Sequence, residues 1–256
     1  MTDHAITARP AIGLTFASLF RADFTVLLQS SRTLILNIAV PVIIVVITAI
    51  HGGKTGFLTL GFDLSLALSY GLISSSLIGY SITVARDRDA GVFQRLRVTP
   101  APTWTIMTSR LLVQVVVDLV LTVVVAVLFG IVHHFAYSPT QYLLLVVVSL
   151  VGAAVFLSIG QAVVALVRSA TTVNAIGRLL YVVLILLGIV GVSGLLGDVV
   201  QEISLWSPVG AVIELYSTAL GLTHWDGNTT IAVIASALYV VIFAFVGIRW
   251  FRWEPR

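Results

Sequence analysis

The sequence predicts an all-α polytopic membrane protein with six transmembrane helices. Hydrophobic residues make up 59% of its 256 residues and charged residues only 10%, whereas soluble domains carry about 25% charged residues. The apolar residues are Val, Leu, Ile and Ala in long runs, without the alternating pattern of a transmembrane β-barrel. Because lipid offers backbone groups no hydrogen-bond partners, these runs are expected to be helices.

A helix needs about 20 apolar residues to cross the hydrocarbon core of a bilayer. The predicted spans are Thr33–Ile50, Leu60–Val84, Leu111–Val132, Tyr142–Val167, Leu179–Leu196 and Thr230–Ile248. No connection between them is predicted to form a separate soluble domain. We therefore treat residues 1–256 as one transmembrane domain.

Residues 11–30 are predicted to form an interfacial helix before the first span. Their large apolar side chains recur every three or four residues, which places them on one helical face, and Arg21 and Asp23 lie elsewhere. These two charges also argue against a cleaved signal peptide. A helix of this kind lies along the membrane surface. The alternative is a soluble amphipathic helix that packs on another part of the protein.

Residues 204–222 are long enough to cross the membrane but contain Pro208, Gly210 and Glu214. With six spans and a cytoplasmic N-terminus, every Lys and Arg except Lys54 falls on the cytoplasmic side, as the positive-inside rule requires. A seventh span would move the C-terminal arginines outside. We therefore predict an external re-entrant element that packs inside the bundle, and two cytoplasmic termini.

The loop that follows the second predicted span combines charged and apolar side chains. From Ala85 to Pro102 it reads A-R-D-R-D-A-G-V-F-Q-R-L-R-V-T-P-A-P. The pattern predicts a short amphipathic helix that ends at Pro100. Arginines alone would set the topology, whereas Phe93 and Leu96 presented to the cytoplasm would suit docking to a soluble partner. An ordinary charged loop is the alternative.

This loop resembles the coupling segment of ABC-2 type membrane proteins, the transmembrane subunits of ATP-binding-cassette exporters. The shared pattern is an acidic–basic run, a Gly, a Leu and a Thr-Pro pair. Here it consists of Arg86, Asp87, Arg88, Asp89, Gly91, Leu96, Thr99 and Pro100. The family usually has Glu where this chain has Asp87 and Asp89.

Three further features fit the same family. They are an amphipathic helix before the first span, Pro41 within that span, and a Pro-centred element before the last span, although the family often has His where Ser207 stands here. The resemblance covers nearly the whole chain. Its size and small external loops look most like the drug- and lipid-exporter branch, similar to daunorubicin-type permeases.

The resemblance implies a half-transporter in the cell membrane that lacks its own motor. Two such chains, identical or different, would form the path for a hydrophobic drug-like or lipid substrate, and a separate cytoplasmic ATPase would use ATP and Mg²⁺. Export, as opposed to import, rests on the resemblance alone. The residues that would couple to the ATPase are Arg86, Asp87, Arg88, Asp89, Gly91, Phe93, Leu96, Arg97, Thr99 and Pro100.

No ATPase site or cofactor site of its own is expected in the chain. Gly53-Lys54-Thr55 matches the end of a P-loop, but Thr48 stands where the first glycine is required. The adjacent His133 and His134 are not expected to converge on a metal ion, and no catalytic motif of a membrane enzyme is present. The basic residues flank apolar runs, which indicates membrane topology and not nucleic-acid binding.

Polar residues inside the spans are candidates for helix contacts or for the translocation path. An intramembrane carboxylate is costly, so Asp118 either holds helices together or takes part in transport. It could face a cavity, pair with Arg178 or hydrogen-bond Gln114. Asn37 and Gln161 are expected to link helices. Within the re-entrant element, Pro208 and Glu214 are candidates for the exit or for an external interfacial position.

A second function class stays open. The chain could be an ATP-independent, proton-coupled carrier that uses Asp118, or a membrane scaffold. Transport that continues without ATP and collapses with the proton gradient would favour the carrier.

Overall fold

The computed structural model describes residues 12–29, 31–50, 60–97, 102–191 and 197–251, and these residues form helices and turns without a strand. The elements are α1 (Ile12–Gln29), α2 (Ser31–Ile50), α3 (Leu60–Leu72), the π-helical η1 (Ile73–Gly79), α4 (Tyr80–Asp89), α5 (Val92–Arg97), α6 (Thr103–His133), α7 (Pro139–Leu166), α8 (Ala170–Leu186), the π-helical η2 (Leu187–Gly191), α9 (Asp198–Trp206), α10 (Pro208–Ala219) and α11 (Gly227–Trp250).

Among the residues that the structure describes, five helical segments are long and apolar enough to cross a membrane: Gly61–Asp89, Trp104–His133, Pro139–Leu166, Ala170–Gly191 and Gly227–Trp250. Helix α2 adds the shorter apolar stretch Ile38–Ile50 at the place of the first predicted span. The all-α polytopic fold is therefore confirmed.

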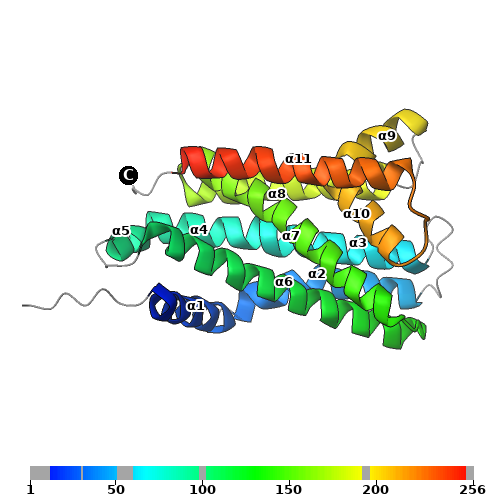
Figure 1. Ribbon diagram of the computed structural model, residues 1–256, viewed down its shortest axis with the longest axis horizontal. Coiled ribbons are helices and arrows are strands. Elements are labelled where there is room, and N and C mark those ends of the chain that lie inside the picture. Colours follow the sequence, from blue (N-terminus) through cyan, green and yellow to red (C-terminus); the bar gives the residue numbers. More distant parts are fainter. Residues whose placement is uncertain (1–11, 30, 51–59, 98–101, 192–196, 252–256) are drawn as a thin grey trace, which may run out of the picture.

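The long helices run side by side and reverse direction at each connection (Figure 1). The end of the bundle that holds α5, the α7–α8 turn and the end of α11 is called the α5 end here. The opposite end, which holds α9 and the turns after α6 and α10, is called the α9 end. Among the described residues, arginines lie at the ends of α4, α5 and α11, whereas Asp198, Glu202 and Asp226 lie at the α9 end.

Three predicted span boundaries are wrong. The third span starts as α6 at Thr103, eight residues before the predicted Leu111. The second span does not stop at Val84 but continues as α4 to Asp89, so the first charges of the predicted coupling segment are helical. The fifth span starts at Ala170, nine residues before the predicted Leu179, because Ser169 caps the helix by accepting a hydrogen bond from the Thr172 amide at 3.1 Å. Polar residues in this first part of α8 lower its hydropathy and hide its start. Residues 192–196, the predicted end of this span, lie outside the described residues.

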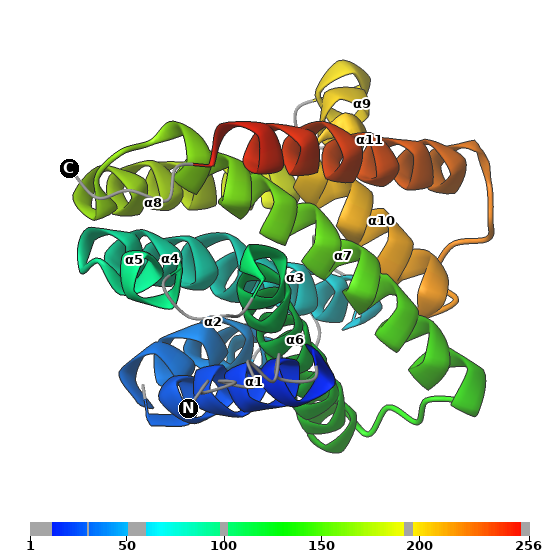
Figure 2. The ribbon, with the colours of Figure 1, turned by 60° about the vertical axis from the view of Figure 1, so that its left-hand side comes forward.

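Helix α1 is a separate helix whose bounds agree with the predicted interfacial helix to within one residue. Phe16, Phe20 and Phe24 stack along one face, with successive ring centroids 6.5 and 6.2 Å apart. Helix α1 lies beside α2 and α6 (Figure 2). It contacts α6 through Asp23, which accepts a hydrogen bond from the Ser109 hydroxyl at 2.7 Å.

Helices α9 and α10 form a hairpin that does not cross the bundle, because α8 ends and α11 begins at the same end (Figure 1). The hairpin starts at Asp198, earlier than the predicted Ser204, and turns at Ser207, whose hydroxyl accepts from the Gly210 amide at 3.1 Å. Helix α10 is almost entirely buried, with Ile213 and Tyr216 0% exposed. The predicted element that enters the bundle without crossing is confirmed.

Candidate functional site

The predicted coupling segment lies at the α5 end and consists of the last turn of α4, a short turn and α5. Gly91 has a φ of +70°, which residues with a Cβ rarely adopt, and its amide donates to the Arg88 carbonyl at 3.0 Å. This glycine therefore lets the chain reverse tightly between the two helices. Thr99 and Pro100 lie outside the described residues, as does the side chain of Arg97.

Phe93 does not point away from the bundle, as the sequence had led us to expect. It is 0% exposed and packs edge-on against Phe251 at the end of α11, with ring centroids 5.9 Å apart. The guanidinium carbon of Arg110 lies 4.7 Å from the centre of the Phe93 ring. Leu96 is also partly buried against the core. The bundle itself covers the apolar face of α5. Removing this apolar surface from water is favourable.

The outward face of the segment is polar. Arg86, Asp89, Gln94 and Arg95 are exposed, whereas Arg88 is only 3% exposed. A soluble protein that approached the α5 end would meet arginines and an amide first. Arg88, predicted as a direct coupling residue, faces into the bundle in this conformation.

Arg110 on α6 lies between two carboxylates from different helices. Its Nη1 forms an ion pair with Asp87 on α4, and its Nε lies 3.8 Å from Asp23 Oδ1 on α1. Burial raises the pKa of Asp23, while the Ser109 hydrogen bond and Arg110 oppose that shift. One arginine therefore joins α1, α4 and α6 beneath the coupling segment.

Arg88 and Asp89 join the end of α4 to the connection between α7 and α8. Arg88 donates to the carbonyls of Val164, Val167 and Arg168 at 2.7, 2.9 and 2.9 Å. Asp89 accepts from the amide of Ala170 at 2.9 Å. The charged pair after the second span therefore touches two further spans.

Asp118 on α6 is 0% exposed and belongs to a polar chain that crosses the bundle. It accepts hydrogen bonds from the Ser76 hydroxyl of η1 and, at 3.2 Å, from Gln114 Nε2. Gln114 Nε2 also donates to Ser75 Oγ at 2.5 Å. Of the surroundings considered for Asp118, the structure shows the Gln114 bond, and Arg178 is exposed on α8 instead of paired with it.

The chain of polar groups continues from α6 to the hairpin. Thr122, one turn beyond Asp118, donates to Ser149 Oγ on α7 at 2.9 Å. The hydroxyls of Ser149 and Tyr216 lie 2.7 Å apart. Thr122 Oγ1 also lies 2.9 Å from the backbone carbonyl oxygen of Asp118, so polar side chains and this one carbonyl link η1, α6, α7 and α10. Sequence analysis had singled out Asp118 and Gln114, but not Ser149 or Tyr216, which look unremarkable in an apolar run.

The other candidates in the spans have separate surroundings. Gln161 on α7 accepts a hydrogen bond from the Tyr80 hydroxyl of α4 at 2.7 Å. Pro208 is the first residue of α10. Asn37 belongs to α2, but its side chain lies outside those described. Asp63, which sequence analysis missed, is 0% exposed on α3, and neither carboxylate oxygen has a hydrogen-bond partner within the described part of the chain.

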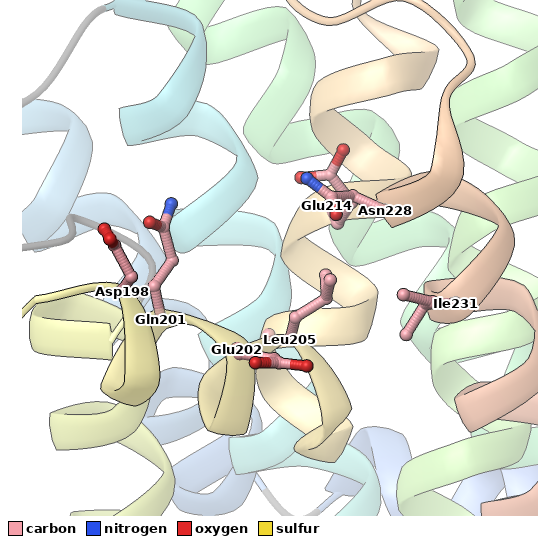
Figure 3. Close-up of a pocket in the computed structure, with 8 residues that line it drawn as sticks. Asp198, Gln201, Glu202, Leu205, Glu214, Asn228 and Ile231 are labelled. Atoms are coloured by element: carbon pink, nitrogen blue, oxygen red, sulfur yellow. The ribbon is translucent and has the colours of Figure 1, made fainter.

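A cavity of about 270 Å³ opens between α9, α10 and α11 at the α9 end. Its polar lining comes from Asp198, Gln201, Glu202, Glu214 and Asn228. Asp198, Gln201, Glu202 and Leu205 come from α9, Glu214 from α10, and Asn228 and Ile231 from α11 (Figure 3). The predicted candidate Glu214 is therefore half-buried in an acidic cavity and not inside the bundle core. Across the described residues, no group of His, Asp or Glu side chains is arranged to hold a metal ion.

Matches to known proteins include most of the helices described above. A family model described as "ABC-2 type transporter" matches residues 15–221, from α1 through α10. Over 141 residues the chain is 29% identical to "Putative transport permease YvfS" of Bacillus subtilis (strain 168). That match covers 54% of this chain and 57% of the relative, so it spans little more than half of either protein.

Proposed function

This chain belongs to the ABC-2 type transporter family, and we propose that it is the membrane-spanning subunit of an ATP-driven exporter. Two such chains form the translocation path, and a separate cytoplasmic ATPase binds ATP and Mg²⁺. The proposed cargo is a hydrophobic drug-like molecule or a lipid. The protein lies in the cell membrane, with both termini in the cytoplasm.

The observation that best supports this proposal is the position of α5. This short helix lies at the end of the bundle where arginines follow or close α4, α7 and α11. By the positive-inside rule that end faces the cytoplasm, where an ATPase would be available. In the proposal the ATPase contacts the exposed side chains Arg86, Gln94 and Arg95, while Phe93 and Leu96 hold α5 against the bundle from behind.

Asp118 is assigned a structural part in this proposal. Its carboxylate already has two side-chain partners, Ser76 and Gln114, which hold η1 against α6. A buried carboxylate whose two oxygens both accept hydrogen bonds from neighbouring side chains is better suited to joining helices than to binding cargo. Large apolar side chains on the outer faces, such as Leu179, Val241 and Ile248, are left for lipid or for the second chain.

Co-purification with an ATPase tests the proposal directly. The chain is co-expressed with a tagged candidate ATPase encoded beside its gene, and both the captured permease and the ATP hydrolysis of the complex are measured. We expect the parent chain and Arg178→Gln, a charge removal on the exposed face of α8, to co-purify equally. The triple variant Arg86→Ala, Gln94→Ala, Arg95→Ala should lose most of the complex.

Two results would contradict the proposal. One is the absence of any complex with the parent chain. The other is export of a lipophilic dye that continues with a hydrolysis-deficient ATPase and stops when the proton gradient is dissipated. The second result would support the ATP-independent carrier instead.

A further inference from the structure

Two consecutive residues at the end of α4 hold both sides of the α7–α8 connection. That connection consists of Val167, Arg168 and Ser169 only. Arg88 donates to carbonyls on the α7 side of it, and Asp89 accepts from the first amide of α8. The pair therefore contacts both the end of α7 and the start of α8.

The charges of this pair match the two helix ends that they contact. The last carbonyls of a helix and its first amides lack partners within the helix, and the helix dipole favours a positive charge at the carbonyl end and a negative charge at the amide end. Arg88 stands at the carbonyl end of α7, and Asp89 stands at the amide end of α8. The planar guanidinium can serve several carbonyls at once, which a lysine ammonium does less well.

The same two residues lie next to α5 in the chain. Only Ala90 and Gly91 separate Asp89 from Val92, and the Gly91 amide donates to the Arg88 carbonyl at 3.0 Å. A displacement of α5 therefore acts on Arg88 through a very short, hydrogen-bonded piece of backbone. The side chain of Arg88 carries that displacement to a part of the sequence about 80 residues away.

We propose that Arg88, supported by Asp89, is the positioning residue that transmits movement of α5 to α7 and α8. Without it, α5 is joined by the chain itself to α4 and, through the following segment, to α6. With it, the α7–α8 turn follows the end of α4, and two more helices respond to the same push. This inference rests on the proposed function, because the push comes from the ATPase.

The absence of cysteine from the chain allows a direct test. Two single-cysteine reporters are made at buried positions, Leu121→Cys on α6 and Leu184→Cys on α8, which are 3% and 6% exposed in the parent protein. Each reporter is purified as the full complex with the ATPase in nanodiscs. Its rate of maleimide labelling is measured without nucleotide and with ATP plus vanadate.

Each reporter is combined with Arg88→Gln and with the control Arg178→Gln. We expect ATP to change the labelling rate of both reporters by about fivefold or more in the parent and in the control, which is the lower range of coupling between distant sites. With Arg88→Gln the response of Leu184→Cys should be lost and that of Leu121→Cys should remain. Arg88→Lys, which keeps the charge, should restore part of the α8 response.

A purely structural role for Arg88 predicts a different pattern. Loss of both responses, or of neither, would overturn the inference while leaving the proposed function intact. If the parent chain fails to bind the ATPase, the proposed function and this inference fail together. If Arg88→Gln does not fold, Asp89→Ala decides the matter. This substitution removes the contact with Ala170 and the 3.7 Å ion pair with Arg88 from a half-exposed side chain, and an unchanged α8 response in that variant would also overturn the inference.

Discussion

The two ends of the bundle hold their charged side chains in different ways. At the α5 end, Arg88 donates to carbonyls of α7 and of the α7–α8 connection, and Arg110 pairs with carboxylates of α1 and α4. At the α9 end, Asp198 and Glu202 line a cavity, and Val199 and Ile203 of α9 are 72% and 59% exposed. Local opening needs least free energy where few contacts are broken. We therefore expect local opening to need less free energy at the α9 end than at the α5 end.

The largest effect on stability is expected from a substitution that leaves a cavity in the core at the α5 end. Phe93→Ala removes a side chain that is 0% exposed and contacts Phe251 and Arg110. Such a truncation costs about 3–5 kcal/mol, and the midpoint of thermal unfolding in detergent should fall accordingly. Phe245→Ala is the control, since Phe245 is 63% exposed on α11. An equal fall in both variants would mean that the α5 end is no better packed than the lipid-facing surface.

Two carboxylate substitutions, one in the polar chain and one at the α9 end, should change the stability of the protein in opposite directions. Asp118→Ala leaves Ser76 and Gln114 without their acceptor, and each buried group left unpaired costs about 1–3 kcal/mol. Asp63→Asn should be neutral or stabilising, because it removes a buried charge that has no partner among the described residues. Thermal unfolding of both variants tests this difference in sign. If Asp63→Asn lowered the unfolding temperature as much as Asp118→Ala does, the side chain of Asp63 would be as important for stability as the polar chain.

A smaller effect is expected from the turn between α9 and α10. Ser207→Ala removes the side chain that accepts from the Gly210 amide, and the loss of such a cap costs about 1 kcal/mol. Limited proteolysis or hydrogen exchange of α9 and α10 should increase while α5 stays protected. Equal changes at both ends would argue against an independently moving hairpin.

The smallest effect concerns pH at the contact between α1 and α6. Burial raises the pKa of Asp23 above its ordinary value of 3.8, so the folded protein binds this proton more tightly than the unfolded chain does. By linkage, the contribution of Asp23 to stability is fully present below the ordinary pKa and declines as the pH rises through the raised value. Hydrogen exchange of α1 measured from pH 4 to pH 7 should therefore speed up beyond the intrinsic pH dependence. Asp23→Asn should remove that excess, and its persistence in the variant would assign it to another group.

The fold was largely predictable because the features that determine it, hydropathy and charge, can be read directly along the sequence. Hydropathy predicts the spans. The positions of the Lys and Arg residues, with Lys54 as the single exception, then distinguish a hairpin at residues 198–219 from a seventh span. The start of α8 was missed because its first residues are polar, although Ser169 caps the helix and Asp89 accepts from its first amide.

The surroundings of the site were less predictable because they depend on which partner covers an amphipathic face. The pattern around Phe93 and Leu96 shows that one side of α5 is apolar, but it does not say whether the bundle or another protein buries that side. The partner of Asp118 one turn away, Gln114, follows from helical spacing, whereas Ser76 reaches it from the π-helical η1 of another span. Asp63 was overlooked because a carboxylate in the first turn of a span is normally read as part of the interface.

The contact between Phe251 and Phe93 has a practical consequence for anyone who purifies this protein. An affinity tag or fluorescent protein fused behind Arg256 would follow Phe251, the neighbour of α5, by only five residues and could crowd the surface proposed for the ATPase. A failed capture would then report the fusion and not the missing partner. A flexible spacer, which extends at most about 3.3–3.6 Å per residue, or a tag carried by the ATPase removes that ambiguity.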